Sequence, residues 1–139
     1  MSKRKVIFQR AEILRQLTEI VADIADGNVF CHDRPSAISP GVEKFIIVRL
    51  PQGIRSASDI HSTCVVQIVV FTKDNEGGLE DTLGLDEMAS QVYDRLPITT
   101  PLFSAIEPKQ LNGGNDGLGF HTLIIQLRLI IHKNISEQP

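Results

Sequence analysis

The strongest β-strand pattern in the chain covers Thr63 to Thr72, where every residue except Gln67 is apolar or β-branched. Successive side chains of a strand point to opposite faces of a sheet. One face would carry Cys64, Val66, Ile68 and Val70, and the other Thr63, Val65, Gln67, Val69 and Phe71. Because both faces are largely apolar, we expect this strand at the centre of a sheet to which the other strands are added.

Four further segments show strand patterns: residues 28–32, 43–50, 103–111 and 118–133. In the last of them, one face carries Leu123, Ile125, Leu127, Leu129 and Ile131. At ~3.3 Å per residue, even twelve residues of it would span about 40 Å, which is longer than the usual strand. We expect this strand to extend beyond the rest of the domain.

Proline and glycine interrupt the chain between these strands. Asp33–Gly41 contains two prolines and a glycine and is predicted to be a loop. Gln52–Ile60 is either a loop or a hairpin arm that projects from the body. Asn112–Gly117 is predicted to be a turn before the last strand, because it lacks the Lys-Ser/Thr ending of a phosphate-binding loop and does not open a helix.

Two segments have the spacing of apolar residues that is typical of one helical face. In Gln9–Ala25 this face holds Ile13, Leu14, Leu17, Ile20, Val21 and Ile24. In the second segment, which Pro97 closes, it holds Leu85, Met88, Ala89, Val92, Tyr93 and Leu96. Gly27 is a suitable end for the first helix, since glycine adopts the left-handed conformation that terminates helices.

The pattern predicts a single α+β domain over residues 1–139, with the element order α-β-β-β-α-β-β and a mostly antiparallel sheet. We place both helices on one face, because two helices do not easily cover both faces of a wide sheet. The opposite face is too apolar for solvent and too polar for a core, which favours a partner surface. The alternative is that a strand curls over and buries this face. The residues expected at the partner surface are Arg49, Val65, Gln67, Phe71, Gln126 and Arg128.

Composition and charge restrict the possible functions. With 42% hydrophobic and 22% charged residues, the chain has the amino-acid composition of a folded globular protein. Its net charge of -3 argues against a general nucleic-acid binder. Only Val6–Phe8 is apolar after the basic start, so neither a signal peptide nor a membrane span is expected. Cys31 and Cys64 fit reduced thiols in the cytoplasm, and we predict no disulfide.

Two clusters contain residue types that are used in chemistry. Cys31, His32 and Asp33 could supply a nucleophile, a base and an orienting group, but neighbours in a strand point to opposite sides. A zinc site from Cys31, His32, His61 and Cys64 would require four side chains to converge that are split across strand faces. We therefore predict no catalytic, metal or cofactor site.

Five segments carry a resemblance to a known family. They are Val29-Phe-Cys-His-Asp-Arg-Pro-Ser36, Phe45-Ile-Ile-Val-Arg-Leu50, Val66-Gln-Ile-Val-Val-Phe71, Val92-Tyr-Asp-Arg-Leu-Pro97 and Thr122-Leu-Ile-Ile-Gln-Leu-Arg-Leu-Ile-Ile131. In these runs and in its element order, almost the whole chain resembles the tail terminator, or tail-completion, proteins of long-tailed bacteriophages and prophages, the family of the lambda-type minor tail protein U. The resemblance consists of elements and short apolar runs, without a catalytic signature.

The resemblance implies a structural protein that is not an enzyme and binds no cofactor. Such a protein assembles with itself into a hexameric ring, caps the tail tube protein, stops tail polymerisation and joins the head–tail connector protein. It would be found in the virion tail or neck, and in the host cytoplasm during assembly, with no membrane partner and no specific nucleic acid. Carboxylates lining the ring would repel DNA that passes through it, and candidates for this role are Asp74, Glu76, Glu80 and Asp81. These four residues could instead form a solvated loop and helix start. The alternative functions are another head–tail neck or stopper component, or a small metal-binding or enzymatic domain.

Overall fold

The computed structural model of the chain describes residues 9–56 and 61–132. Residues 1–8, 57–60 and 133–139, which include the basic start, part of the Gln52–Ile60 connection and the predicted end of the last strand, lie outside this description. The described elements are α1 (Gln9–Val21), β1 (Val29–Cys31), β2 (Lys44–Arg49), β3 (Arg55–Ser56), β4 (His61–Lys73), α2 (Thr82–Tyr93), β5 (Ile98–Thr99), β6 (Phe103–Asn115) and β7 (Phe120–His132). The predicted α+β class is confirmed, and the element order is broadly as predicted, with the short strands β3 and β5 added.

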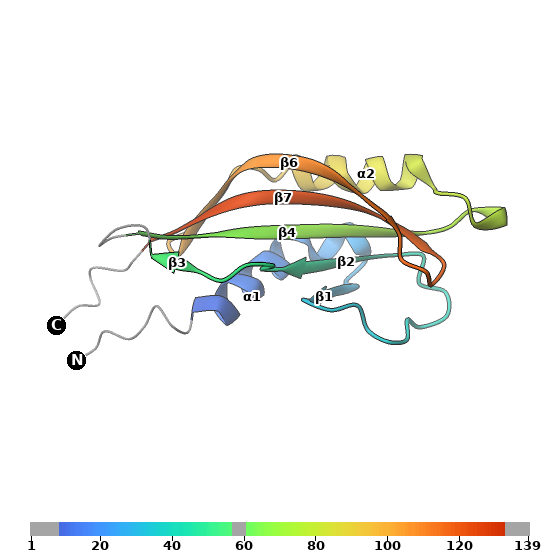
Figure 1. Cartoon of the computed structure of the whole chain (residues 1–139), viewed down its shortest axis with the longest axis horizontal. Helices are drawn as coiled ribbons and strands as arrows, with labels where there is room; N and C mark the ends of the chain where they lie inside the picture. The colour runs from blue at the N-terminus through green and yellow to red at the C-terminus, as the bar shows by residue number, and fades with distance from the viewer. Residues whose placement is uncertain (1–8, 57–60, 133–139) are drawn as a thin grey trace.

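The sheet has the strand order β1-β2-β4-β7-β6-β5, and β3 pairs with one end of β4 (Figure 1). The only parallel pair among the described strands is β1 with β2. β4 and β7 pair along their whole length of 13 residues, from His61 opposite His132 to Lys73 opposite Phe120. The strand with the strongest sequence pattern therefore lies inside the sheet, between β2 and β7, as predicted for a central strand.

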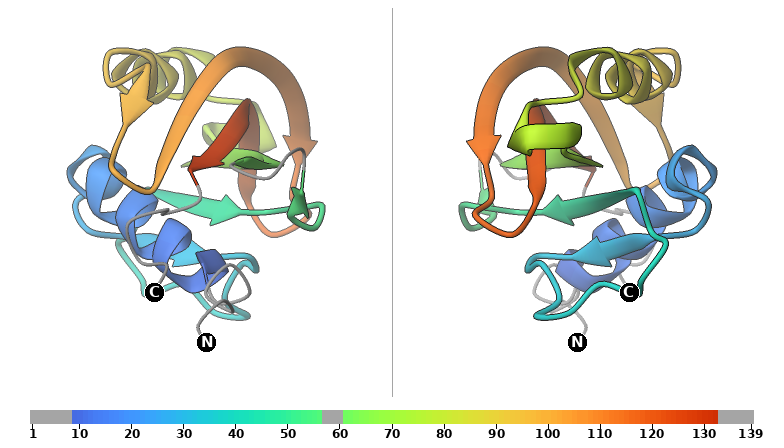
Figure 2. Two further views of the ribbon diagram at one scale, coloured as in Figure 1. Left: turned by 90° about the vertical axis from the view of Figure 1, so that its left-hand side faces the viewer. Right: turned by 90° about the vertical axis from the view of Figure 1, so that its right-hand side faces the viewer.

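Both helices pack against the same face of the sheet, as the end-on views in Figure 2 show. On α1, the apolar stripe predicted from the sequence points inward, and Ile13, Leu17 and Val21 are fully buried. A short 3-10 turn at Ala22–Ala25 continues α1, and the helical segment ends where Asp26 and Gly27 take positive φ angles of 54° and 86°. The predicted position of the helix end is thus confirmed.

α2 begins after Asp81, whose side-chain Oδ1 accepts a hydrogen bond from the backbone N–H of Gly84 at 3.1 Å. Just beyond its end, the guanidinium of Arg95 donates to the backbone oxygen of Ile20 at 2.7 Å and to Asp23 Oδ1 at 2.6 Å. Arg95 therefore connects the ends of the two helices, which are far apart in the sequence.

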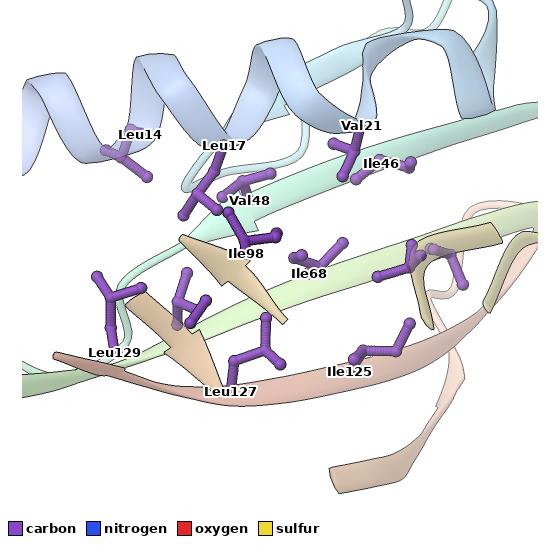
Figure 3. Packing of buried hydrophobic residues seen from close by; sticks show 14 of the residues in the cluster. Leu14, Leu17, Val21, Ile46, Val48, Ile68, Ile98, Ile125, Leu127 and Leu129 are labelled. Carbon is purple, nitrogen blue, oxygen red and sulfur yellow. The ribbon is translucent and has the colours of Figure 1, made fainter. Parts of the chain in front are cut away.

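The inner core lies between the helices and the sheet (Figure 3). It contains the sheet rows that the alternation predicts: Ile46, Val48 and Leu50 on and just after β2, Cys64, Val66, Ile68 and Val70 on β4, and Leu123, Ile125, Leu127, Leu129 and Ile131 on β7. Ile98 of β5 also enters this core, because the sheet curls strongly through β6 (Figures 2 and 3). At roughly 1.5–3 kcal/mol for each large aliphatic side chain that is fully buried, these contacts are the main stabilising contribution to the fold.

The predicted turn at Asn112–Gly117 is wrong in its boundaries, because β6 continues to Asn115. A Cβ on Gly113 would lie 1.9 Å from Thr122 Oγ1, so only glycine permits this close approach to β7. The Thr122 hydroxyl donates to the backbone oxygen of Gly114 at 3.1 Å. The glycines therefore mark a β-bulge within a strand, and the turn consists of residues 116–119.

The connection at Gln52–Ile60 includes a short hairpin arm. Arg55 and Ser56 pair with Thr63 and Ser62, which agrees with the hairpin alternative for the part that is described. No helix in the described part of the chain is long and apolar enough to cross a membrane.

Candidate functional site

The outer face of the sheet, opposite the helices, is divided into a closed half and an open half. In the closed half, five side chains form a second apolar cluster: Phe45, Ile47, Val69, Phe71 and Phe120. Ile38 and Val42, from the loop between β1 and β2, pack against this cluster together with Phe30. A loop that the sequence pattern leaves without regular structure therefore covers one half of the face that was expected to be a partner surface.

Aromatic contacts hold the closed half together. The rings of Phe45 and Phe71 are stacked with centroids 4.2 Å apart, and the ring of Phe120 meets Phe45 edge-on at 5.1 Å. Phe71 was expected at the partner surface, but it is only 6% exposed. This expectation is wrong, because the chain buries Phe71 with its own phenylalanines.

Arg34 fixes the covering loop to the turn between β6 and β7. Its Nε atom donates to Asp116 Oδ2 at 2.9 Å, and the two side chains are only 16% and 8% exposed. Its guanidinium carbon lies 5.5 Å from the ring centroid of Phe45 and 5.6 Å from that of Phe120. Sequence reasoning missed this pair, since its members are 82 positions apart and neither belongs to a periodic pattern.

A row of polar side chains crosses the open half from β2 to β7. Arg49 Nε donates to Gln67 Oε1 at 2.8 Å, and Gln67 Nε2 donates to Gln126 Oε1 at 2.8 Å. The strand register places Lys109 of β6 next to Gln126. The structure thus brings together three of the residues predicted for the partner surface, and it joins them in one hydrogen-bonded row.

Partly exposed apolar side chains lie beside this polar row. Val65 of β4 is aligned with Arg128 of β7 and Ile106 of β6, and Ile130 lies further along β7 on the same face. Val65, Ile106 and Ile130 are partly exposed within the described chain, and Arg128 is exposed. Arg128 contacts Glu107 at 3.4 Å, with both side chains more than half exposed. A polar row beside partly exposed apolar residues is the composition of a protein–protein interface.

The four acidic residues that were candidates for a ring lumen do not form one surface. The Asp74 carboxylate is 2.5 Å from His121 Nδ1 and its side chain is only 9% exposed, so it is bound within the chain and does not line a solvent channel. Asp81 caps α2, as described above. Glu76 and Glu80 are exposed, and only these two of the four keep an accessible carboxylate without a capping role.

The two cysteines lie in different environments. Cys31 is exposed on β1, whereas Cys64 is buried on the inner face of β4, and β2 lies between the two strands. Burial raises the pKa of the Cys64 thiol to about 11, which disfavours the reactive thiolate. In residues 9–56 and 61–132, no group of three or more His, Cys, Asp or Glu side chains could hold a metal ion.

In comparisons with known proteins, the sequence matches no protein-family model and none of the curated proteins.

Proposed function

We propose that the chain is a structural subunit that assembles into a ring and caps a phage tail tube, as a tail terminator does. The observation that supports this proposal is the open half of the outer face. Arg49, Gln67 and Gln126 form a hydrogen-bonded row there, and partly exposed Val65 and Ile130 lie on one side of it. The closed half, in contrast, is already filled by the chain itself.

The polar row suits a repeated contact between subunits. Its side chains are held in place by one another, so less conformational freedom is lost when a partner binds. Arg49 and Gln126 retain unused hydrogen-bonding capacity, because a guanidinium has five N–H donors and an amide has both donors and an acceptor. The flanking aliphatic side chains add apolar area that association removes from water.

The first test is the mass of the full-length protein by light scattering over a range of concentrations. A hexamer should have about six times the monomer mass of 15.4 kDa. Arg128→Glu should shift the equilibrium toward the monomer, since it places a negative charge on the open half. Ala11→Glu is the matched control, because Ala11 is exposed in the first turn of α1, where an added carboxylate suits the helix dipole.

The second test addresses the tail tube. When the protein is added to polymerising tail tube protein encoded in the same genome, electron microscopy should show shorter tubes with a ring at one end. A protein that remains monomeric at every concentration, or that leaves tube length unchanged, contradicts the proposed function.

A further inference from the structure

A second surface, separate from the outer face, lies between α2 and β6. Here the structure has a hollow of about 520 Å³ that is lined by Asp86, Ala89, Ser90, Tyr93, Asp94 and Gln110. The lining comes from one side of α2 and from the middle of β6, which Figure 1 shows next to each other.

The edge of β6 beside this hollow has no strand partner within the described chain. β5 pairs only with Ser104 and Ala105, so the outer edge of β6 beyond Pro108, from Lys109 to Asn115, presents backbone groups that could accept another strand. Peptides often bind proteins by adding a strand to such an edge, with side-chain pockets alongside it. The backbone of β6 and the hollow beside it together provide both parts of this kind of site.

The hollow is acidic. Asp86 and Asp94 are exposed at its rim, and neither forms an ion pair with another described residue. The chain has no Lys or Arg between Lys73 and Arg95, so α2 itself supplies no compensating charge. Its floor is less polar, because Ala89 is buried and the Tyr93 ring packs against the inner core. The matching ligand is an extended segment that combines basic and apolar side chains.

The chain itself contains such a segment. Residues 3–8 read Lys-Arg-Lys-Val-Ile-Phe, with three cations followed by three apolar residues. α1, which follows this segment, lies below α2 on the same face of the sheet (Figure 2).

We propose that residues 3–8 of one copy bind as an added strand along β6 of a second copy, in the hollow beside α2. Lys3, Lys5 and Ile7 share one face of an added strand, so the two cations then face Asp86 and Asp94, and Ile7 covers Ala89 and Tyr93. This contact joins two different surfaces, and such head-to-tail contacts close into rings when the rotation permits it. The arrangement of copies rests on the proposed ring, whereas the binding of the segment does not.

Tyr93 provides a direct readout, because the chain has one tyrosine and no tryptophan. The acceptor is the full chain with Lys3→Glu, Arg4→Glu and Lys5→Glu, and the probe is a synthetic peptide of residues 1–10. Tyrosine fluorescence should change saturably as the peptide is added, and a peptide with Glu at positions 3–5 should cause no such change.

Charge variants of the hollow test its specificity. Asp86→Asn with Asp94→Asn in the acceptor should weaken peptide binding about tenfold at low salt, since each exposed ion pair contributes modestly. Glu19→Gln with Asp33→Asn makes the same change of charge on exposed residues elsewhere and should leave the affinity unchanged. Equal binding by all acceptors, or an unchanged tyrosine signal, overturns the inference.

A disulfide trap shows whether the contact joins two copies. Full chains with Ile7→Cys and with Ser90→Cys, both carrying Cys31→Ser, should form a cross-linked dimer when they are mixed and oxidised. A chain that carries both new cysteines and links only to itself overturns the inference. If trapping succeeds but light scattering shows no ring, the proposed function fails and this contact stands. If rings form equally well with Glu at positions 3–5, this contact fails and the proposed ring stands.

Discussion

The closed and open halves of the outer face lie on the same strands, but they differ in what covers them. Both halves continue the alternation of β4 and β7, and both include apolar residues that point away from the helices. In the closed half, Phe45 and Phe71 are buried by Ile38 and Val42 of an irregular loop. In the open half, Val65 remains partly exposed beside a polar row. Whether a sheet face becomes core or surface is therefore decided here by a loop.

Each half also contains an arginine–carboxylate pair, and the two pairs differ in the same way. Arg34 and Asp116 are largely buried at 2.9 Å, whereas Arg128 and Glu107 are 52% and 63% exposed at 3.4 Å. Water screens the second pair and hardly reaches the first. The closed half should thus respond to mutation through folding stability, and the open half through association.

The largest effect is expected for Phe45→Ala in the closed half. Phe45 is fully buried and contacts Phe30, Phe71 and Phe120, so its removal leaves a cavity between four elements. The free energy of unfolding, measured by urea denaturation, should fall by about 3–5 kcal/mol. Val65→Ala in the open half should cost less than about 1 kcal/mol, and similar losses for the two variants would remove the distinction between the halves.

A smaller effect is expected for Arg34→Leu. The substitution keeps an apolar side chain over the phenylalanine rings but leaves the buried Asp116 carboxylate without its cation. We expect a loss of about 1–3 kcal/mol in the free energy of unfolding. Arg34→Lys, which retains the charge, should lose less. An unchanged stability in Arg34→Leu would show that the loop is held by its apolar contacts alone.

In the open half, Gln67→Glu should change stability by less than about 1 kcal/mol, because a carboxylate can still accept from Arg49 Nε. Its effect should be on assembly, since the new negative charge lies in the middle of the polar row. Light scattering should show a shift toward the monomer, and urea denaturation should show a folded protein. Unfolding of this variant would mean that Gln67 is a core residue.

The smallest effect is expected for Glu107→Gln, which removes the exposed ion pair with Arg128. The free energy of unfolding should change by no more than about 0.5 kcal/mol. A loss as large as that of Arg34→Leu would contradict the contrast between the two pairs.

Much of the fold could be predicted because it follows from periodic patterns. The alternation in β4 and β7 and the helical stripe around Leu17 and Leu85 predict which side chains enter the inner core, and the structure places them there. The covering of the outer face could not be predicted. Arg34 and Asp116 are far apart in the sequence, and only the three-dimensional path of the chain brings them together.

The end of β6 illustrates a different limit of sequence reasoning. Gly113 and Gly114 are typical turn residues, and their composition alone favours a turn. The actual role of Gly113 depends on Thr122 of the neighbouring strand, which occupies the space that a Cβ would need, whereas Gly114 supplies a positive φ of 76° at the bulge. A glycine that serves a close approach therefore cannot be distinguished from a turn glycine until its partner strand is known.

The long pairing of β4 with β7 has a mechanical consequence. Antiparallel hydrogen bonds run perpendicular to the strands. A force that slides β4 past β7 along the strand axis therefore loads all of these hydrogen bonds in shear at the same time. This ladder extends over the full 13 residues of each strand. Peeling one strand away from its end would instead break the bonds one after another. The molecule is therefore best suited to carry load along β4 and β7, and least suited to resist force that lifts one of these strands from an end.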